Sequence, residues 1–110
     1  SCGDEITLEL EVKDGIIQDA SFTGVGCAIS QASTSLMIGL IKGQPVEKAR
    51  KLADLFIRMI KGEVEDEGEL ENLEDAAALK NISHMPARVK CAVLSWHTLD
   101  TVLQNEEFRR

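Results

Sequence analysis

The chain has 110 residues, of which 44% are hydrophobic, and a formal net charge of −7. This length suits a single domain spanning residues 1–110, with an ordinary core and no need for disulfide bonds. No apolar run is long enough to cross a bilayer, and the first residues do not follow the pattern of a secretory signal. We therefore expect a cytoplasmic protein without a membrane partner.

The negative charge is concentrated in one place. Eight of the 19 acidic residues lie in residues 63–75 (EVEDEGELENLED), hereafter the acidic segment, which contains no Lys or Arg. The rest of the chain carries 12 basic and 11 acidic residues, a net charge of +1. Such a surface has no broad basic area, so we expect no nucleic-acid partner. The simplest interpretation of the acidic segment is a solvated face.

The first element is a predicted β-hairpin. Hydrophobic residues occupy every even position from 6 to 12 and polar residues the odd ones, which is typical of a strand with one buried face. Residues 13–15 (KDG) favour a turn, and residues 16–23 should return as an antiparallel strand. Because an isolated hairpin is only marginally stable, helices are expected to cover it.

Helical periodicity replaces the alternation after residue 27. It predicts one helix over about residues 28–42, a second that Pro45 opens and Gly62 ends, and a last one from Pro86 to about Leu103. A weaker pattern near residues 70–79 predicts a short additional helix. The expected fold class is α+β, an antiparallel hairpin or small sheet packed against several helices.

Two patterns place reactive side chains at one end of this hairpin. Cys27 follows GVG at the start of the first helix, where backbone N–H groups and the helix dipole favour a thiolate. Continuing the even positions of the first strand backward places Asp4 and Cys2 on its inward face, at the same end. An inward carboxylate without a partner is costly, so the pattern indicates a bound cation or a wet rim.

The third cysteine, Cys91, lies in the first or second turn of the last helix. If that helix abuts the same end of the hairpin, three sulfurs and one carboxylate converge, which suits tetrahedral zinc or an iron site. The alternative is that each thiol is a small buried core residue. His84 and His97 are interpreted as surface or structural residues and only as reserve ligands.

Three stretches, SCGDEITLEL, FTGVGCAISQASTSLM and PARVKCAVLSWHTL, occur in the order found in U-type iron–sulfur cluster assembly proteins, the family of IscU, SufU and the NifU N-terminal domain. The resemblance covers essentially the whole chain. It implies that Cys2, Asp4, Cys27 and Cys91 bind a metal ion or cluster. The family's N-terminal helix and first strand would precede Ser1, so we expect that segment to be missing.

Two departures from the IscU pattern make the chain similar to the SufU branch. Lys90 stands where IscU proteins have a histidine, and the segment between the second and last cysteines is longer. MPARVK, residues 85–90, has one proline where the IscU chaperone motif has two, which argues against an Hsp70-type chaperone as partner.

The resemblance implies two alternative functions, neither of them that of a conventional enzyme, and a third function stays open beside them. A scaffold would hold a transient iron–sulfur cluster and pass it to apo-proteins. A zinc-dependent sulfurtransferase would accept sulfur from a cysteine desulfurase, with Cys2 as the first candidate acceptor and Cys91 as the second. A structural zinc module would only bind a protein partner.

Overall fold

The predicted hairpin is present in a computed structural model that describes residues 5–104. Strand β1 (Glu5–Lys13) pairs with β2 (Ile16–Val25) in an antiparallel two-stranded sheet, with one register irregularity. The turn between them uses left-handed backbone at Asp14 (φ 55°) and Gly15 (φ 77°), which suits the twist of a tight hairpin. Strand β2 runs two residues further than the alternation predicted.

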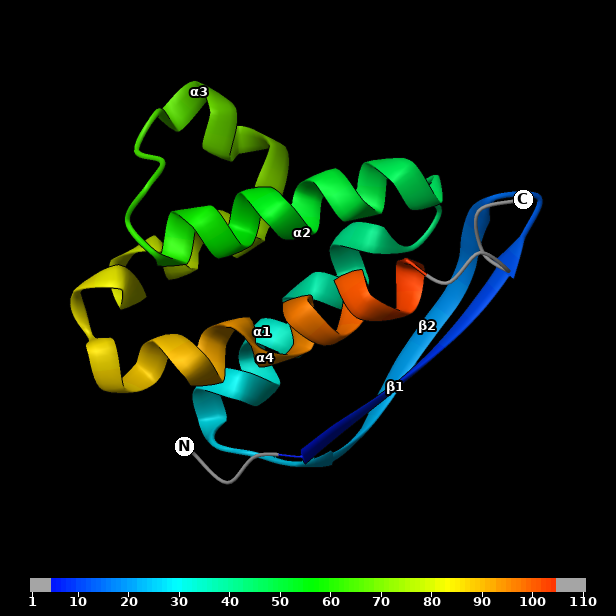
Figure 1. The fold of residues 1–110 in the computed structure, drawn as a ribbon, viewed down its shortest axis with the longest axis horizontal. Helices are drawn as coiled ribbons and strands as arrows, with labels where there is room; N and C mark the ends of the chain where they lie inside the picture. Colours follow the sequence, from blue (N-terminus) through cyan, green and yellow to red (C-terminus); the bar gives the residue numbers. More distant parts are fainter. Residues whose placement is uncertain (1–4, 105–110) are drawn as a thin grey trace.

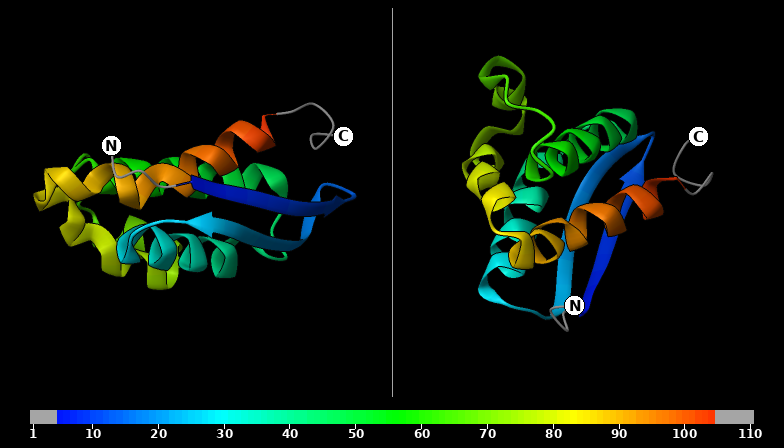
Figure 2. Two further views of the ribbon diagram at one scale, coloured as in Figure 1. Left: turned by 90° about the horizontal axis from the view of Figure 1, so that it is seen from below. Right: turned by 60° about the vertical axis from the view of Figure 1, so that its left-hand side comes forward.

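The helices follow in chain order, and the three long ones confirm the sequence prediction. They are α1 (Ala28–Ile41), α2 (Val46–Ile60), the short α3 (Glu67–Leu70), the 3₁₀ helix η1 (Glu71–His84) and α4 (Pro86–Leu103). Helices α1 and α4 pack together, α2 lies against α4, and the hairpin extends along one side (Figures 1 and 2). This is the expected α+β fold.

The acidic segment differs in form from the regular helix expected near residues 70–79. Only α3 is α-helical, and η1 continues as 3₁₀ helix with a break at Glu74 (φ 51°, ψ −128°). The Asp66 carboxylate accepts a hydrogen bond from the Gly68 N–H at 2.9 Å and caps α3. Crowded like charges three and four residues apart disfavour a longer α-helix here.

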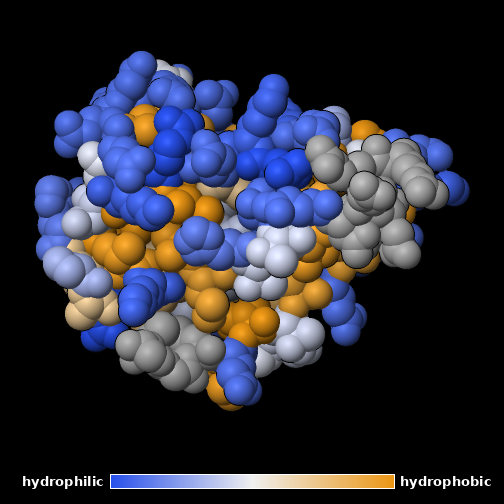
Figure 3. Space-filling view, viewed as in Figure 1, coloured by the Kyte–Doolittle hydropathy of each residue, from blue (hydrophilic) through white to orange (hydrophobic). Residues whose placement is uncertain are grey.

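The core lies where α1, α2 and α4 meet. Trp96 is fully buried at its centre and stacks on Phe56, with ring centroids 4.0 Å apart and planes inclined by 7°. Hydrophilic residues dominate the surface over α2 and α3, with hydrophobic surface between them (Figure 3). Across residues 5–104, no helix combines the length and apolarity needed to span a membrane.

Candidate metal centre

The end of β2 is held close to the start of β1 by a glycine. Gly24 pairs with Ile6 and has φ 136°, a conformation that side chains rarely adopt. A Cβ atom at this position would collide with the Glu5 carbonyl oxygen. Glycine therefore allows the two strand ends to approach closely, as the GVG pattern predicted, and the chain then turns into α1.

Cys27 is the residue from which α1 starts. Its backbone is extended (φ −71°, ψ 169°), and its carbonyl oxygen accepts hydrogen bonds from the Gln31 N–H and the Ser30 hydroxyl, both at 3.1 Å. The Gln31 side-chain amide also donates to the Gly26 carbonyl oxygen at 3.0 Å. These contacts fix the first turn of α1 and leave the Cys27 side chain half-buried at the helix end.

The surroundings of Cys27 favour its ionised form. The backbone N–H of Ser30 makes the largest contribution and lowers the pKa of the thiol, while burial acts in the opposite direction. The Cys91 thiol, the Ile29 N–H and the Ser30 hydroxyl lower the pKa of Cys27 further. Because the thiolate is the form that binds metals, the site has the protonation chemistry of a ligand.

Cys91 comes from α4 and meets Cys27. It lies in the second turn of that helix, is 1% exposed, and its thiol is close enough to that of Cys27 to lower the pKa of the Cys27 thiol. Helix α1 begins where β2 ends, and α4 packs across it, with the first turn of α4 lying further from the hairpin (Figures 1 and 2). The structure thus brings together two cysteines that are 64 positions apart in the chain.

The other two predicted ligands, Cys2 and Asp4, lie outside the described residues. The described chain begins at Glu5, which pairs with Val25, two residues before Cys27. Within residues 5–104, no group of three His, Cys, Asp or Glu side chains could hold a metal ion. Two contacting sulfur donors, one with a lowered pKa, suit a thiophilic metal such as zinc or iron and supply half of a tetrahedral set.

The two histidines lie elsewhere. His97 is exposed on α4 and lines a groove beside α2, whereas His84 is exposed at the end of η1 and borders a separate cavity of about 110 Å³. Neither cavity includes Cys27 or Cys91 among its lining residues. Their interpretation as surface residues agrees with this placement.

Two exposed hydrophobic residues near the thiols were not anticipated from the sequence. Val25 is 65% exposed two residues before Cys27, and Met85 is 46% exposed immediately before α4, the helix that carries Cys91. Their signal in the sequence is weak, because each is a single apolar residue at the boundary of an element, Val25 at the end of β2 and Met85 just before α4. Together they place apolar surface on both chain segments that lead to the thiol pair.

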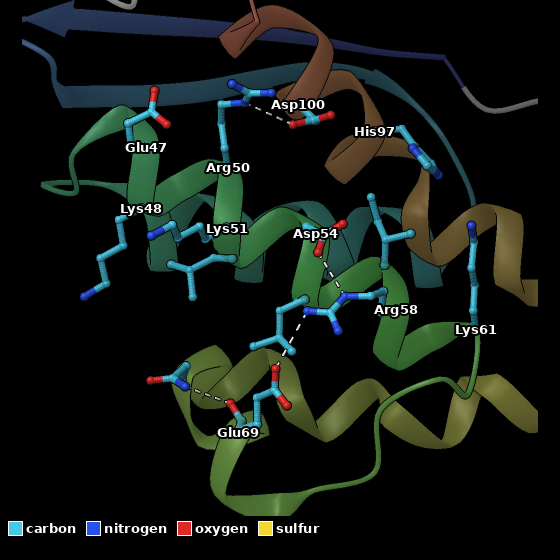
Figure 4. A pocket seen from close by; sticks show the side chains of 14 residues that line it. Glu47, Lys48, Arg50, Lys51, Asp54, Arg58, Lys61, Glu69, His97 and Asp100 are labelled. Atoms are coloured by element: carbon cyan, nitrogen blue, oxygen red, sulfur yellow. Dashed lines mark hydrogen bonds and ion pairs between the residues drawn. The ribbon is translucent and has the colours of Figure 1, made fainter.

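A large groove lies away from the thiols. It is a groove of about 850 Å³ between α2, α4 and the acidic segment (Figure 4). Arg58 pairs with Asp54 at 2.9 Å and with Glu69 at 3.7 Å, and Arg50 pairs with Asp100 at 3.4 Å. We call it the α2 groove; its lining contains charged and aliphatic residues and no cysteine.

Comparison with known proteins places this geometry in context. The family model described as the NifU-like N-terminal domain matches residues 1–107. The iron–sulfur cluster assembly scaffold protein IscU of Thermotoga maritima is 49% identical over 104 residues, which cover 94% of this chain and 71% of that protein. The zinc-dependent sulfurtransferase SufU of Bacillus subtilis is 41% identical over 107 residues, covering 97% and 71%.

Solved structures agree with the sequence comparisons. A protein of Fervidobacterium islandicum, described as an iron–sulfur cluster assembly scaffold for the SUF system, superposes with a TM-score of 0.84 at 38% identity, covering 93% of this chain and 73% of that one. A second crystal structure, of a hypothetical protein, gives a TM-score of 0.88 at 35% identity, covering 94% and 75%.

Proposed function

Because this chain belongs to the NifU-like N-terminal domain family, we propose that it serves iron–sulfur cluster assembly and binds a metal ion or nascent cluster through Cys2, Asp4, Cys27 and Cys91. The observation that carries the proposal is the contact between the Cys27 and Cys91 thiols at the starts of two packed helices. Relatives named IscU and SufU, at 49% and 41% identity, support it.

Chain connectivity supports the inclusion of the two remaining donors. Glu5 lies opposite Val25 at the thiol end of the sheet, and Asp4 directly precedes it. Cys2 is three residues from Glu5, so even a fully extended chain carries it at most about 11 Å away. Three thiolates and one carboxylate form a tetrahedral set in which zinc, when bound, would hold the thiolates deprotonated.

In the scaffold function, iron and sulfide are the cargo and the cluster is passed to an apo-protein. The carboxylate of Asp4 suits this role, because it is a harder and more readily exchanged ligand than a thiolate. Cys27 and Cys91, held together by the packing of α1 and α4, would form the fixed half of the site. The acceptors would be apo iron–sulfur proteins.

The second candidate is a zinc-dependent sulfurtransferase that takes sulfur from a cysteine desulfurase. The acceptor thiolate would attack the outer sulfur of the desulfurase persulfide, the S–S bond would break, and the desulfurase thiolate would leave with the electron pair. Cys91 is only 1% exposed and is poorly placed for this attack. Cys2 therefore remains the first candidate acceptor and Cys91 the second.

This candidate is favoured by the relative named as a zinc-dependent sulfurtransferase, which matches 97% of the chain. Lys90, exposed beside Cys91, also stands where the IscU pattern has a histidine. The exposed apolar side chains of Val25 and Met85, on the chain segments that lead to Cys27 and Cys91, would give the desulfurase apolar surface on which to dock. A structural zinc module is the third candidate and would need no accessible acceptor.

Elemental analysis of the isolated protein, combined with anaerobic reconstitution with iron and sulfide, tests these functions. A cluster absorbance band that replaces loosely held zinc supports the scaffold. One tightly held zinc per chain, no cluster band and stimulation of a cysteine desulfurase support sulfur transfer. Bound zinc with neither a cluster band nor stimulation of a desulfurase supports the structural module. In that case replacing Asp4 by Ala should lower the stability of the protein and have no other effect. The absence of metal in every preparation would contradict all three.

A further inference from the structure

One buried hydroxyl joins the two helices that carry the thiols. Ser33 lies on α1 with no exposed surface, and its Oγ donates a hydrogen bond to the Ala92 carbonyl oxygen on α4 at 2.6 Å. The same Oγ accepts a hydrogen bond from Nε1 of Trp96 at 2.8 Å. Ala92 and Trp96 are one helical turn apart, so the hydroxyl contacts α4 at two successive levels.

These contacts are close to the thiols along both helices. Ala92 directly follows Cys91, and Ser33 is six residues after Cys27, which corresponds to about 9 Å of helix. Helices are stiff over such short lengths. The position of α4 along α1 therefore determines how far the two sulfur atoms are from each other.

Hydrophobic packing alone leaves this position loosely defined, because it has no preferred direction. Hydrogen bonds at 2.6 Å and 2.8 Å are directional, and sliding of α4 along α1 would break both. Trp96 is itself held by its stack on Phe56 of α2. The Ser33 hydroxyl is thus fixed against a rigid partner on one side and the backbone next to Cys91 on the other.

We infer that Ser33 is a positioning residue, whose hydroxyl sets the separation of the Cys27 and Cys91 thiols for metal binding. The inference rests on the proposed function in one respect, namely that the two thiols are ligands. It assigns to Ser33 a role beyond core stability. Loss of the hydroxyl should change the geometry and affinity of the metal site more than loss of a comparable buried hydroxyl elsewhere.

The chain offers a matched control in the next residue. Thr34 is also fully buried on α1, and its Oγ1 donates to the Ser30 carbonyl oxygen at 2.7 Å, within the same helix. Thr34→Val removes a buried hydroxyl whose hydrogen bond stays within α1. Ser33→Ala removes one that spans the junction of α1 and α4 and leaves the indole N–H without its acceptor.

Cobalt(II) is the probe, because its absorption bands report both thiolate ligation and tetrahedral geometry. Each variant is titrated with cobalt(II) under reducing, anaerobic conditions, and urea unfolding of the metal-free protein is measured in parallel. Ser33→Ala should weaken cobalt binding roughly tenfold, as the loss of an outer-shell partner does at other metal sites. Its thiolate-to-cobalt band should also weaken, whereas Thr34→Val should keep the wild-type affinity and spectrum.

Trp96→Phe is a second variant that keeps an aromatic ring against Phe56 and removes the N–H donor together with part of the buried ring system. It should lower cobalt affinity less than Ser33→Ala, because the bond from Ser33 to Ala92 remains, and it provides the test if Ser33→Ala does not fold. Equal cobalt affinities and spectra for the variants at Ser33, Thr34 and Trp96 would overturn the positioning role alone. A wild-type protein with no thiolate-to-cobalt band would overturn the proposed metal centre and the positioning role together.

Discussion

Two regions of the molecule differ in almost every property by which a functional site is usually sought. One is the thiol end, where Cys27 at the start of α1 meets Cys91 of α4, and the other is the α2 groove. The thiol end brings together two cysteines, one of them 1% exposed. The α2 groove is the larger feature, at about 850 Å³, and is lined by charged side chains. Size alone would direct attention to the groove, whereas the two cysteines that we propose as metal ligands lie at the thiol end.

The reason lies in what each region does with its polar groups. In the α2 groove, Arg50 and Arg58 already have carboxylate partners within the protein, at 3.4 Å and 2.9 Å. At the thiol end, backbone N–H groups at the start of α1 stabilise a thiolate. Ion pairs within the protein, as in the groove, stabilise the fold. Hydrogen-bond donors that lower the pKa of a thiol, as at Cys27, are typical of a functional site. Four predictions test this contrast.

Replacing a thiol should have the largest effect. Cys27→Ser and Cys91→Ser should each weaken zinc binding on the order of 100-fold or more, exceeding the cost of losing an outer-shell partner. Affinity is measured by competition with a chromophoric chelator. Lys51→Ser, in the α2 groove, should leave zinc affinity unchanged. Full zinc content in Cys27→Ser would remove the thiol end as the metal centre.

The second-largest effect should come from replacing Gly24, which allows the ends of β1 and β2 to approach closely. Gly24→Ala places a Cβ against the Glu5 carbonyl oxygen and should lower the free energy of unfolding by about 1–3 kcal/mol. Gly39→Ala, on α1, is the matched control, because a Cβ added there has open space around it. It should raise the free energy of unfolding by about 0.5–1 kcal/mol. Urea unfolding of the metal-free proteins measures both. Equal effects of the two substitutions would show that the close approach is not required.

The lowered pKa of Cys27 predicts a pH dependence in the metal-free Cys2→Ser protein. Alkylation of Cys27 by iodoacetamide should have its midpoint below the pKa of about 8.5 of an ordinary cysteine. The associated stability is fully present above the unfolded-state pKa and is lost as the pH falls through the folded-state value. Peptide mass spectrometry separates Cys27 from the buried Cys91. A midpoint at or above that of an unfolded peptide would contradict the prediction.

The smallest effect should come from the α2 groove. Arg50 and Asp100 are 27% and 35% exposed, and their pair joins α2 to α4. A double-mutant cycle with Arg50→Gln and Asp100→Asn should give a coupling of about 0.2–1 kcal/mol in urea unfolding. Zinc content should not change in any member of the cycle. A tenfold loss of zinc affinity would link the groove to the thiol end and end the contrast between them.

Much of the fold could be predicted because its patterns are local. Alternation along β1 and helical stripes along α1, α2 and α4 are each visible within one segment. The structure of the acidic segment could not be predicted in the same way. Charge crowding there yields a 3₁₀ helix with a break at Glu74 and leaves little periodicity in the sequence. A backbone break at a non-glycine residue has no reliable sequence signal.

The site was only partly predictable for a related reason. Strand direction alone places Cys27 beside the start of β1, but the meeting with Cys91 depends on how α4 packs across α1. The contact between Ser33 and Trp96 spans 63 positions and gives no periodic signal in the sequence. The roles of Cys2 and Asp4 stay predictions, because both residues lie outside the described part of the chain.

The stack of Trp96 on Phe56 gives the protein a built-in optical reporter. The chain has one tryptophan and no tyrosine, so its ultraviolet emission comes almost entirely from a single buried indole. That indole is five positions along α4 from Cys91 and is hydrogen-bonded to the helix that begins at Cys27. The metal loading or sulfur transfer proposed for the thiol end should therefore be observable in real time by stopped-flow fluorescence, without a label and without altering the site.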